Sequence, residues 1–238
     1  MVCPITLQIA ALLIAAGVVL SALACVQWPA ALLFFLGALC MGLNIFETYI
    51  DHWPYTPMYM NSRLMVLFLG TLCPVLCLCG KWDSKAYGLT IGLTMLLLTF
   101  ATLFFPKDYY MPNIRSASIW SHLYSLANPL GRAIFVASAT DTISGNTKSP
   151  LMELAFISFA IAIFSGMLFS INGLGTPISF HQPEVIGFMF IWFLCLLISH
   201  AQWTRFSPSL FKALHVSAAL LTILVTIKFD LGVWRPLW

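Results

Sequence analysis

Residues 164–200, FSGMLFSINGLGTPISFHQPEVIGFMFIWFLCLLISH, place two strongly apolar runs on either side of a short segment rich in glycine, proline and polar residues. Each apolar run belongs to a stretch close to the 20 residues that an α-helix needs to cross a bilayer. The segment between them, residues 170–184, predicts a loop, because glycine and proline interrupt helices. Pro183 followed by Glu184 is typical of a helix start. The stretch therefore predicts two membrane helices and the loop that joins them.

The rest of the chain has the same character. Of its 238 residues, 61% are hydrophobic and only 8% are charged, and the mean hydropathy is +0.94. A soluble domain carries about 25% charged residues, so the sequence predicts an integral membrane protein in contact with lipid. The fold class expected is all-α, a polytopic helical bundle that forms one domain over residues 1–238. The apolar runs predict about eight membrane helices, at residues 5–26, 29–49, 63–80, 87–105, 118–137, 151–171, 184–203 and 211–229.

The fifth predicted span is less apolar than the others, since it contains His122, Asn128, Pro129 and Arg132. Polar groups in a membrane helix are costly to expose to lipid, and they usually face the interior of the bundle or a cavity. We therefore expect these side chains to point inward.

Eight spans place both termini on one side of the membrane, together with the loop at residues 170–184. Six of the 11 basic residues lie on the opposite side, a small excess that favours that side as cytoplasmic. The termini and the 170–184 loop are therefore expected to face outward. The first apolar run has no positively charged start and no small-residue cleavage site, so it is expected to be retained. The net charge of +3 is spread over the loops, which makes nucleic acid an unexpected partner.

Other residue types give little support for catalysis. Cys73, Cys77 and Cys79 lack the CxxC spacing of zinc sites and a nearby histidine, so packing is expected for these thiols. GLGTPIS at residues 173–179 is not a phosphate-binding loop, and no serine lies in the context of an acyl-transfer nucleophile. Glu153 and Glu184 stand near helix starts, where a carboxylate serves either as a proton-relay group or as a partner of the helix dipole.

Histidine is the residue type with the most chemistry to offer, because a neutral imidazole is a common ligand of haem iron. His52, His122 and His181 lie on the outward side of the predicted bundle. His200 ends the seventh span and His215 begins the eighth, so these two can face each other as ligands or as a hydrogen-bonded pair. A single membrane histidine is also often a satisfied polar group, and the sequence leaves both alternatives open.

Residues 164–200 resemble a segment of the CcsA-type haem-handling proteins of cytochrome c assembly (CcsA, CcmC, CcmF and ResC-like proteins). In that family a glycine-containing span precedes a tryptophan-rich loop, roughly WGxYWxWDPKETW, and an apolar span that ends in histidine follows. The family's aspartate is replaced here by histidine, and its tryptophans by Leu174, Ile178, Phe180 and Ile186. The positions that fall on the pattern are Gly166, Gly175, Phe180, His181, Glu184 and, with an offset of one residue, His200.

Two upstream segments extend the resemblance over residues 45–232. DHWPYTPMYMNSRLMVLF, residues 51–68, is similar to the family's HFPxSNxYES segment and keeps His52, Pro54 and Tyr59. SIWSHLYSL, residues 118–126, is similar to the segment that supplies the first external haem-ligand histidine, which is His122 in this sequence. No histidine follows the last span, where the family has a second one.

The resemblance implies a divergent member of the family. The implied function is delivery of haem b across the membrane and its presentation for covalent attachment to c-type apocytochromes. A ResB/CcsB-type membrane partner would complete the holocytochrome c synthase, in a bacterial inner membrane or an equivalent energy-transducing membrane. The residues implied to contact haem are His52, His122, Phe180, His181, Glu184, His200 and His215, with His122 and His200 as iron ligands.

Two alternatives stay open. One is a b-haem or quinol-interacting anchor subunit of a respiratory complex, in which His200 pairs with His215 or with His122. The other is a small transporter or structural membrane subunit without haem, whose polar side chains line a pathway.

Overall fold

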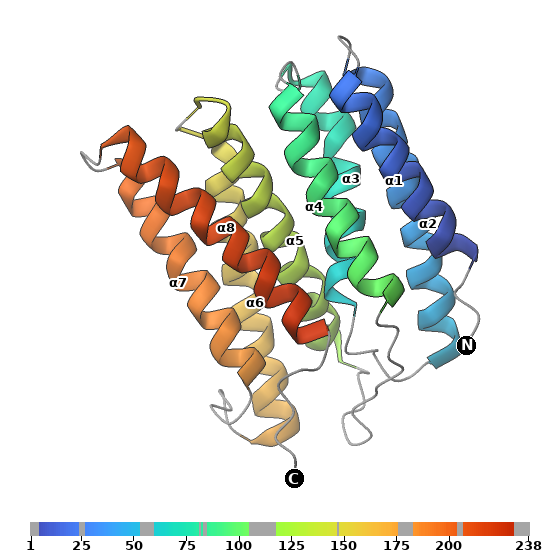
Figure 1. Ribbon diagram of the computed structural model, residues 1–238. Coiled ribbons are helices and arrows are strands. Elements are labelled where there is room, and N and C mark those ends of the chain that lie inside the picture. Colours follow the sequence, from blue (N-terminus) through green and yellow to red (C-terminus); the bar gives the residue numbers. More distant parts are fainter. Residues whose placement is uncertain are drawn as a thin grey trace.

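The computed structural model describes residues 5–23, 27–52, 60–80, 82, 85–104, 118–146, 148–175, 183–203 and 207–230. Over these ranges the protein is built from helices alone, which confirms the predicted all-α class. The helices run alternately up and down along one common axis (Figure 1). They are α1 (Ile5–Leu23), α2 (Trp28–His52), α3 (Asn61–Leu78), α4 (Lys85–Phe104), α5 (Ile119–Ile143), α6 (Pro150–Leu174), α7 (Pro183–Trp203) and α8 (Pro208–Asp230).

Six of the described helices, α1, α2, α3, α4, α6 and α8, are long and apolar enough to cross a membrane. In α7 the apolar part is shorter and covers Val185–Ala201. The chain is thus an integral membrane protein by the length and composition of its helices. Large apolar side chains on the outer faces, such as Leu12 and Phe164, are well exposed, as expected for surfaces that meet lipid.

The expected helix ends agree with the structure to within a few residues, except at the end of α5. Its predicted span stops at residue 137, whereas the helix continues to Ile143. The hydroxyls of Thr140 and Thr142 donate to the carbonyl oxygens of Val136 and Ser138, four residues back, at 3.1 and 3.3 Å. These bonds satisfy the polar groups inside the helix, so a loss of hydropathy does not end it.

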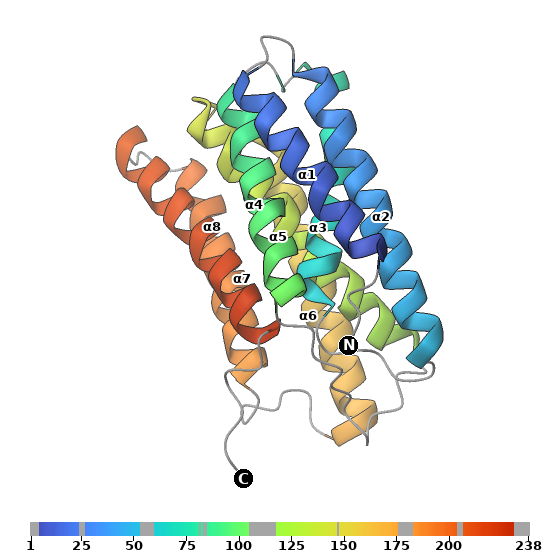
Figure 2. The same ribbon diagram turned by 45° about the vertical axis from the view of Figure 1, so that its right-hand side comes forward.

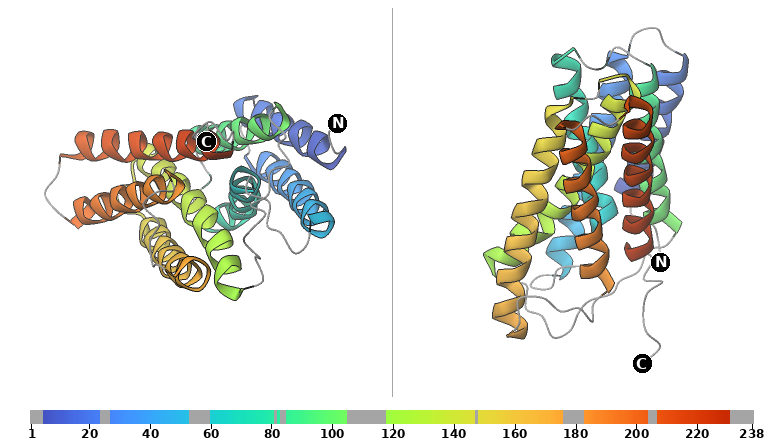
Figure 3. Two further views of the ribbon diagram at one scale, coloured as in Figure 1. Left: turned by 90° about the horizontal axis from the view of Figure 1, so that it is seen from below. Right: turned by 90° about the vertical axis from the view of Figure 1, so that its left-hand side faces the viewer.

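The bundle consists of helices α1 to α4 on one side, helices α6 to α8 on the other, and α5 between these two groups. Helices α1 to α4 pack on one another, and α6, α7 and α8 pack in sequence on the other side. Helix α5 contacts α3 and α4 in the first group and α6 and α8 in the second. Views along and around the axis show α5 between the two groups, with α7 at one edge and α1 and α2 at the other (Figures 2 and 3).

The two ends of the bundle are distinguished by the histidine that lies at each of them. We call "the His122 end" the end where α1, α3, α5 and α7 begin and where α2, α4, α6 and α8 finish; it is the lower end in Figure 1. We call the opposite end "the His200 end". The start of α1 and the finish of α8 thus lie at the same end, and so do the end of α6 and the start of α7.

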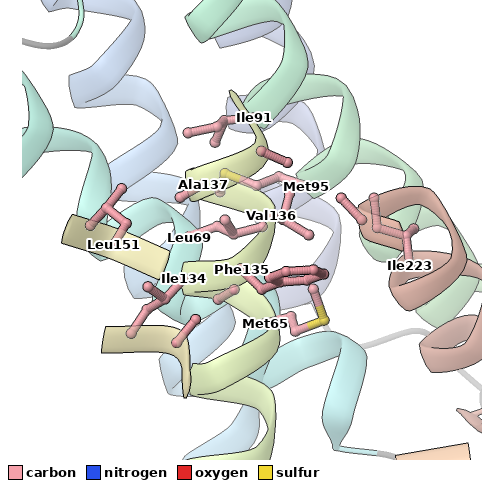
Figure 4. Packing of buried hydrophobic residues seen from close by; sticks show 14 of the residues in the cluster. Met65, Leu69, Ile91, Met95, Ile134, Phe135, Val136, Ala137, Leu151 and Ile223 are labelled. Carbon is pink, nitrogen blue, oxygen red and sulfur yellow. The ribbon is translucent and has the colours of Figure 1, made fainter. Parts of the chain in front are cut away.

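The apolar core lies where the two groups meet (Figure 4). Leu69 of α3, Met95 of α4 and Phe135 of α5 are fully buried there. The backbones of α2 and α3 approach each other closely at Gly70. A Cβ atom on Gly70 would overlap the Cβ of Ala38 and would lie 2.7 Å from the Phe34 carbonyl oxygen. Only glycine fits this crossing.

Gly70→Ala is expected to force α2 and α3 apart and to lower the free energy of unfolding by about 1–3 kcal/mol, the usual cost of overpacking. The measurement is thermal unfolding in detergent, followed by circular dichroism. Gly42→Ala is the matched control, because a Cβ on Gly42 meets only the flexible end of Leu67, at 3.3 Å. Equal stability of the two variants would contradict the close crossing of α2 and α3.

Candidate functional site

The predicted histidines lie at both ends of the bundle. His122 is in the first turn of α5 and is half-buried, His200 is in the last turn of α7 and is exposed, and His215 is buried in α8. His52 is the last residue of α2, at the His122 end, but its side chain lies outside the described part of the structure. Phe180 and His181, and the side chain of Glu184, also lie outside it.

The hydrogen bonds of His122 fix the tautomer of its neutral ring. Nδ1 lies 2.9 Å from the carbonyl oxygen of Ser118. A carbonyl oxygen only accepts, so Nδ1 carries the hydrogen and donates it. Nε2 then presents its lone pair, which accepts a hydrogen bond from the hydroxyl of Tyr49 in α2 at 2.5 Å. A histidine that donates one ring N–H to a backbone carbonyl and offers the other nitrogen is the arrangement common among metal ligands.

The start of α5 holds His122 in this orientation. Ser118 is the N-cap of α5, with extended backbone angles, and its hydroxyl accepts from the backbone N–H of Ser121. The Ser118 carbonyl also accepts from the hydroxyl of Ser121 at 2.7 Å. N-cap serine is favoured because it satisfies a backbone donor that has no partner within the helix. The same residue therefore caps the helix and orients the histidine.

Polar contacts tie four helices together around His122. Next to Tyr49, the hydroxyl of Thr48 donates to the carbonyl of Asn44 and accepts from Nη1 of Arg63 in α3, at 2.8 and 3.1 Å. Nearer the start of α1, Thr6 donates to the carboxylate of Glu47 at 3.1 Å. Sequence reasoning did not single out Tyr49 or Arg63. The only sequence signal for Tyr49 is its spacing, three residues before His52.

The connection from α6 to α7 belongs to the same end. Helix α6 runs to Leu174 and stops at Gly175, whose φ of 73° is in the left-handed region that favours glycine. Further back in α6, a Cβ on Gly166 would lie 2.9 Å from the Tyr124 ring, so this glycine leaves room for Tyr124 to lie against α6. Tyr124 also packs edge-to-face on Phe188 of α7, with ring centroids 5.9 Å apart. The first turns of α5 thus adjoin both α6 and α7.

His215, in contrast, is held by α5 through both ring nitrogens. Nδ1 is 2.9 Å from the hydroxyl oxygen of Thr142, and Nε2 is 3.0 Å from that of Ser138. Both hydroxyls also donate to backbone carbonyls of α5, Ser138 to Phe135 and Thr142 to Ser138, so each ring nitrogen of His215 lies against a hydroxyl that is itself bonded within α5. With both nitrogens bonded to α5, neither faces His200. The described residues therefore give His215 the role of a satisfied polar group in the α5–α8 contact.

Further contacts near the His200 end fix the last turns of α5. Asp141 of α5 is buried and accepts from the Tyr87 hydroxyl of α4 at 3.0 Å. It also accepts from Ser149, which caps α6. Lys212 of α8 donates to the carbonyl of Ile143 at 3.0 Å, where a cation favours the helix C-terminus.

His122 and His200 cannot bind the same iron. They lie at opposite ends of the bundle, and a helix of 21 residues such as α7 is roughly 30 Å long. If both bind iron, they bind separate haems. In the part of the chain that the structure describes, no three histidine, cysteine or acidic side chains gather as a metal cluster. Among the described side chains, no second histidine lies beside His122 at this end of the bundle.

The inward-facing polar residues of α5 form a buried network, as expected from the sequence. Arg132 is 2% exposed, and it donates from Nε to the side-chain oxygen of Asn128 and from Nη1 to the hydroxyl of Thr226, at 2.9 and 2.8 Å. The Thr226 hydroxyl in turn lies 3.6 Å from the sulfur of Met65 in α3, and the buried Asp230, the last residue of α8, accepts from the backbone N–H of Ser62 in α3 at 2.7 Å. The network joins α3, α5 and α8.

Arg132→Gln is expected to lower the free energy of unfolding by about 1–3 kcal/mol, because the buried oxygens of Asn128 and Thr226 lose the donors from which they accept. Combining Arg132→Gln with Thr226→Val removes both partners of one of these bonds, so the double variant is expected to be less destabilised than the sum of the single variants. Chemical denaturation in mixed micelles measures the four proteins of this cycle. Strict additivity would show that Arg132 and Thr226 do not interact.

No protein-family model, curated protein or solved structure matches the chain. The case for a function therefore rests on the contacts described above. They bring together Tyr49, His122 and Arg63 at one end of the bundle, next to the end of α6 and the start of α7. They set His200 and His215 apart at the other end.

Proposed function

We propose that the protein binds haem b at the His122 end of the bundle and presents it for covalent attachment to c-type apocytochromes. The observation that carries the proposal is the fixed tautomer of His122, whose Nδ1–H is held by Ser118 and whose Nε2 offers a lone pair. The resemblance of residues 164–200 to the haem-presenting segment of CcsA-type proteins supports the same end, because α6 finishes and α7 starts there.

The nitrogen ligands proposed at the His122 end suit haem as a transported molecule. His122 supplies one axial nitrogen. The second is proposed to come from His52, three residues after Tyr49 in α2, or from His181, in the chain between Gly175 and Pro183 that begins and ends at the His122 end. Bis-histidine ligation is common for haem b. When bound, haem supplies the vinyl groups that react with the apocytochrome thiols.

Arg63 is proposed to pair with a propionate. Its guanidinium contacts Thr48, the neighbour of the Tyr49 that bonds His122, so this cation lies beside the proposed ligand. A guanidinium recognises a carboxylate through two parallel hydrogen bonds, which gives both affinity and orientation. Arg63 is half-buried, so its side chain can reach a propionate at the edge of the bundle without a movement of α3.

The remaining parts of the proposal concern the membrane and the partners. We place α5 and α7 across the bilayer with the six helices that are long and apolar enough to cross it, and both termini on the outer side. Outside the bundle, the described residues include only helix ends and short connections. The surface that docks the apocytochrome is therefore proposed to come from a ResB/CcsB-type subunit in the bacterial inner membrane or an equivalent membrane. The pair would act together as a holocytochrome c synthase.

His122→Ala is expected to reduce covalent haem attachment at least tenfold, because it removes the only iron-binding nitrogen whose geometry the structure describes at this end. The chain is expressed with the partner subunit and a reporter that carries a CxxCH sequence, and haem staining of the denatured reporter measures attachment. Leu123→Ala, an exposed position in the same turn of α5, is the control for damage to the helix. Normal attachment by His122→Ala would rule out the ligand role of this residue.

The buried network of Arg132 favours a second candidate, a membrane subunit whose polar side chains line a pathway. A charge inside a membrane bundle is costly, and such residues often mark the route of an ion or substrate. The visible spectrum of the purified protein separates the two functions. A Soret band after haem-replete expression is expected for the haem-handling protein, and its absence would favour the second candidate.

A further inference from the structure

We propose that Tyr49 competes with haem iron for Nε2 of His122 and thereby lowers the affinity for haem. The inference rests on the proposed function, because it concerns the same histidine. Tyr49 is not part of any motif in the sequence, and its role follows from the geometry of its contact with His122.

Iron and the Tyr49 hydroxyl need the same lone pair. The hydroxyl donates to Nε2 at 2.5 Å, and the two rings meet edge-to-face with centroids 6.1 Å apart. The other nitrogen is no alternative for iron, because Nδ1 carries the hydrogen that the Ser118 carbonyl holds. A nitrogen lone pair accepts one hydrogen bond or forms one metal bond. Tyr49 therefore has to leave Nε2 before iron can bind.

The exchange of Tyr49 for iron requires little rearrangement. Both side chains are half-buried rather than enclosed. Helix α3 lies between α2 and α5, so within the described helices the contact between α2 and α5 here is made by side chains, not by packed backbones (Figure 3). Meanwhile the bonds of Thr48 to Asn44 and Arg63 hold the end of α2 in place. Rotation of the Tyr49 side chain frees Nε2 and leaves the helices where they are.

Competition from Tyr49 suits a protein that must release the haem it carries. Binding of haem breaks the bond between Tyr49 and His122, and release of haem restores it. The restored bond offsets part of the iron–nitrogen bond that is lost, so haem leaves more readily than from a histidine without a competitor. From the usual net strength of one hydrogen bond, the expected effect on affinity is about five- to tenfold.

Tyr49→Phe tests the proposal on the purified full-length protein in detergent. Ferric haem is titrated into the haem-free protein with the Soret band as the signal, and the rate of haem loss is measured with an excess of an apo-haem-protein as acceptor. The variant is expected to bind haem about five- to tenfold more tightly and to lose it more slowly. Tyr124→Phe is the matched control on α5, and it is expected to behave as the unchanged protein.

A second readout does not depend on haem. Nitrogen NMR of the haem-free protein, labelled at histidine, reports the protonation of each ring nitrogen of His122. In Tyr49→Phe the Nε2 resonance is expected to shift as its donor is lost, while Nδ1 stays protonated through Ser118. An unchanged Nε2 resonance would show that Tyr49 does not hold this nitrogen.

The outcomes distinguish this inference from the proposed function. Unchanged or weaker haem binding by Tyr49→Phe, with binding lost in His122→Ala, overturns the competitor role and leaves the ligand role of His122 intact. Haem binding that survives His122→Ala overturns the proposed ligand itself, and the competitor role falls with it.

Discussion

The cost of keeping the Arg132 guanidinium inside an apolar bundle constrains the whole arrangement of helices. A buried charge needs hydrogen-bond partners. The acceptors that Arg132 uses come from more than one helix. Asn128 comes from the same helix and Thr226 comes from α8, and Thr226 in turn contacts the sulfur of Met65 in α3. Helix α5 therefore has to lie between the two groups of helices, and this position brings its first turn within reach of α2, α6 and α7.

The sequence predicts the class of fold well because membrane helices follow from composition alone. Apolar runs located the eight helices of the described residues, and the inward orientation of Asn128 and Arg132 followed from the cost of exposing them to lipid. The end of α5 could not be predicted from hydropathy. Ser138, Thr140, Asp141 and Thr142 are polar, yet the hydroxyls among them bond within the helix and their burial depends on α4, α6 and α8, which are distant in sequence.

The candidate site is less predictable, since a histidine's role depends on its hydrogen-bond partners. His122 and His215 look alike in the sequence, each lying near the start of an apolar run. The hydroxyls of Ser138 and Thr142, more than 70 residues away in the chain, occupy both nitrogens of His215. One partner of His122 is local, the carbonyl four residues back, and the other, Tyr49, is distant. Only the local partner, Ser118, could be predicted from the sequence, because it belongs to the start of the helix that contains His122.

The capping of α5 by Ser118 couples the folding of one turn to the chemistry of His122. The carbonyl that closes the first turn is also the one that keeps the hydrogen on Nδ1, so the histidine has a defined tautomer only while that turn is wound. A protein that docked at the His122 end and unwound a single turn of α5 would let the ring exchange its tautomer and rotate. Such a partner would change which nitrogen of His122 offers a lone pair without contacting the ring itself.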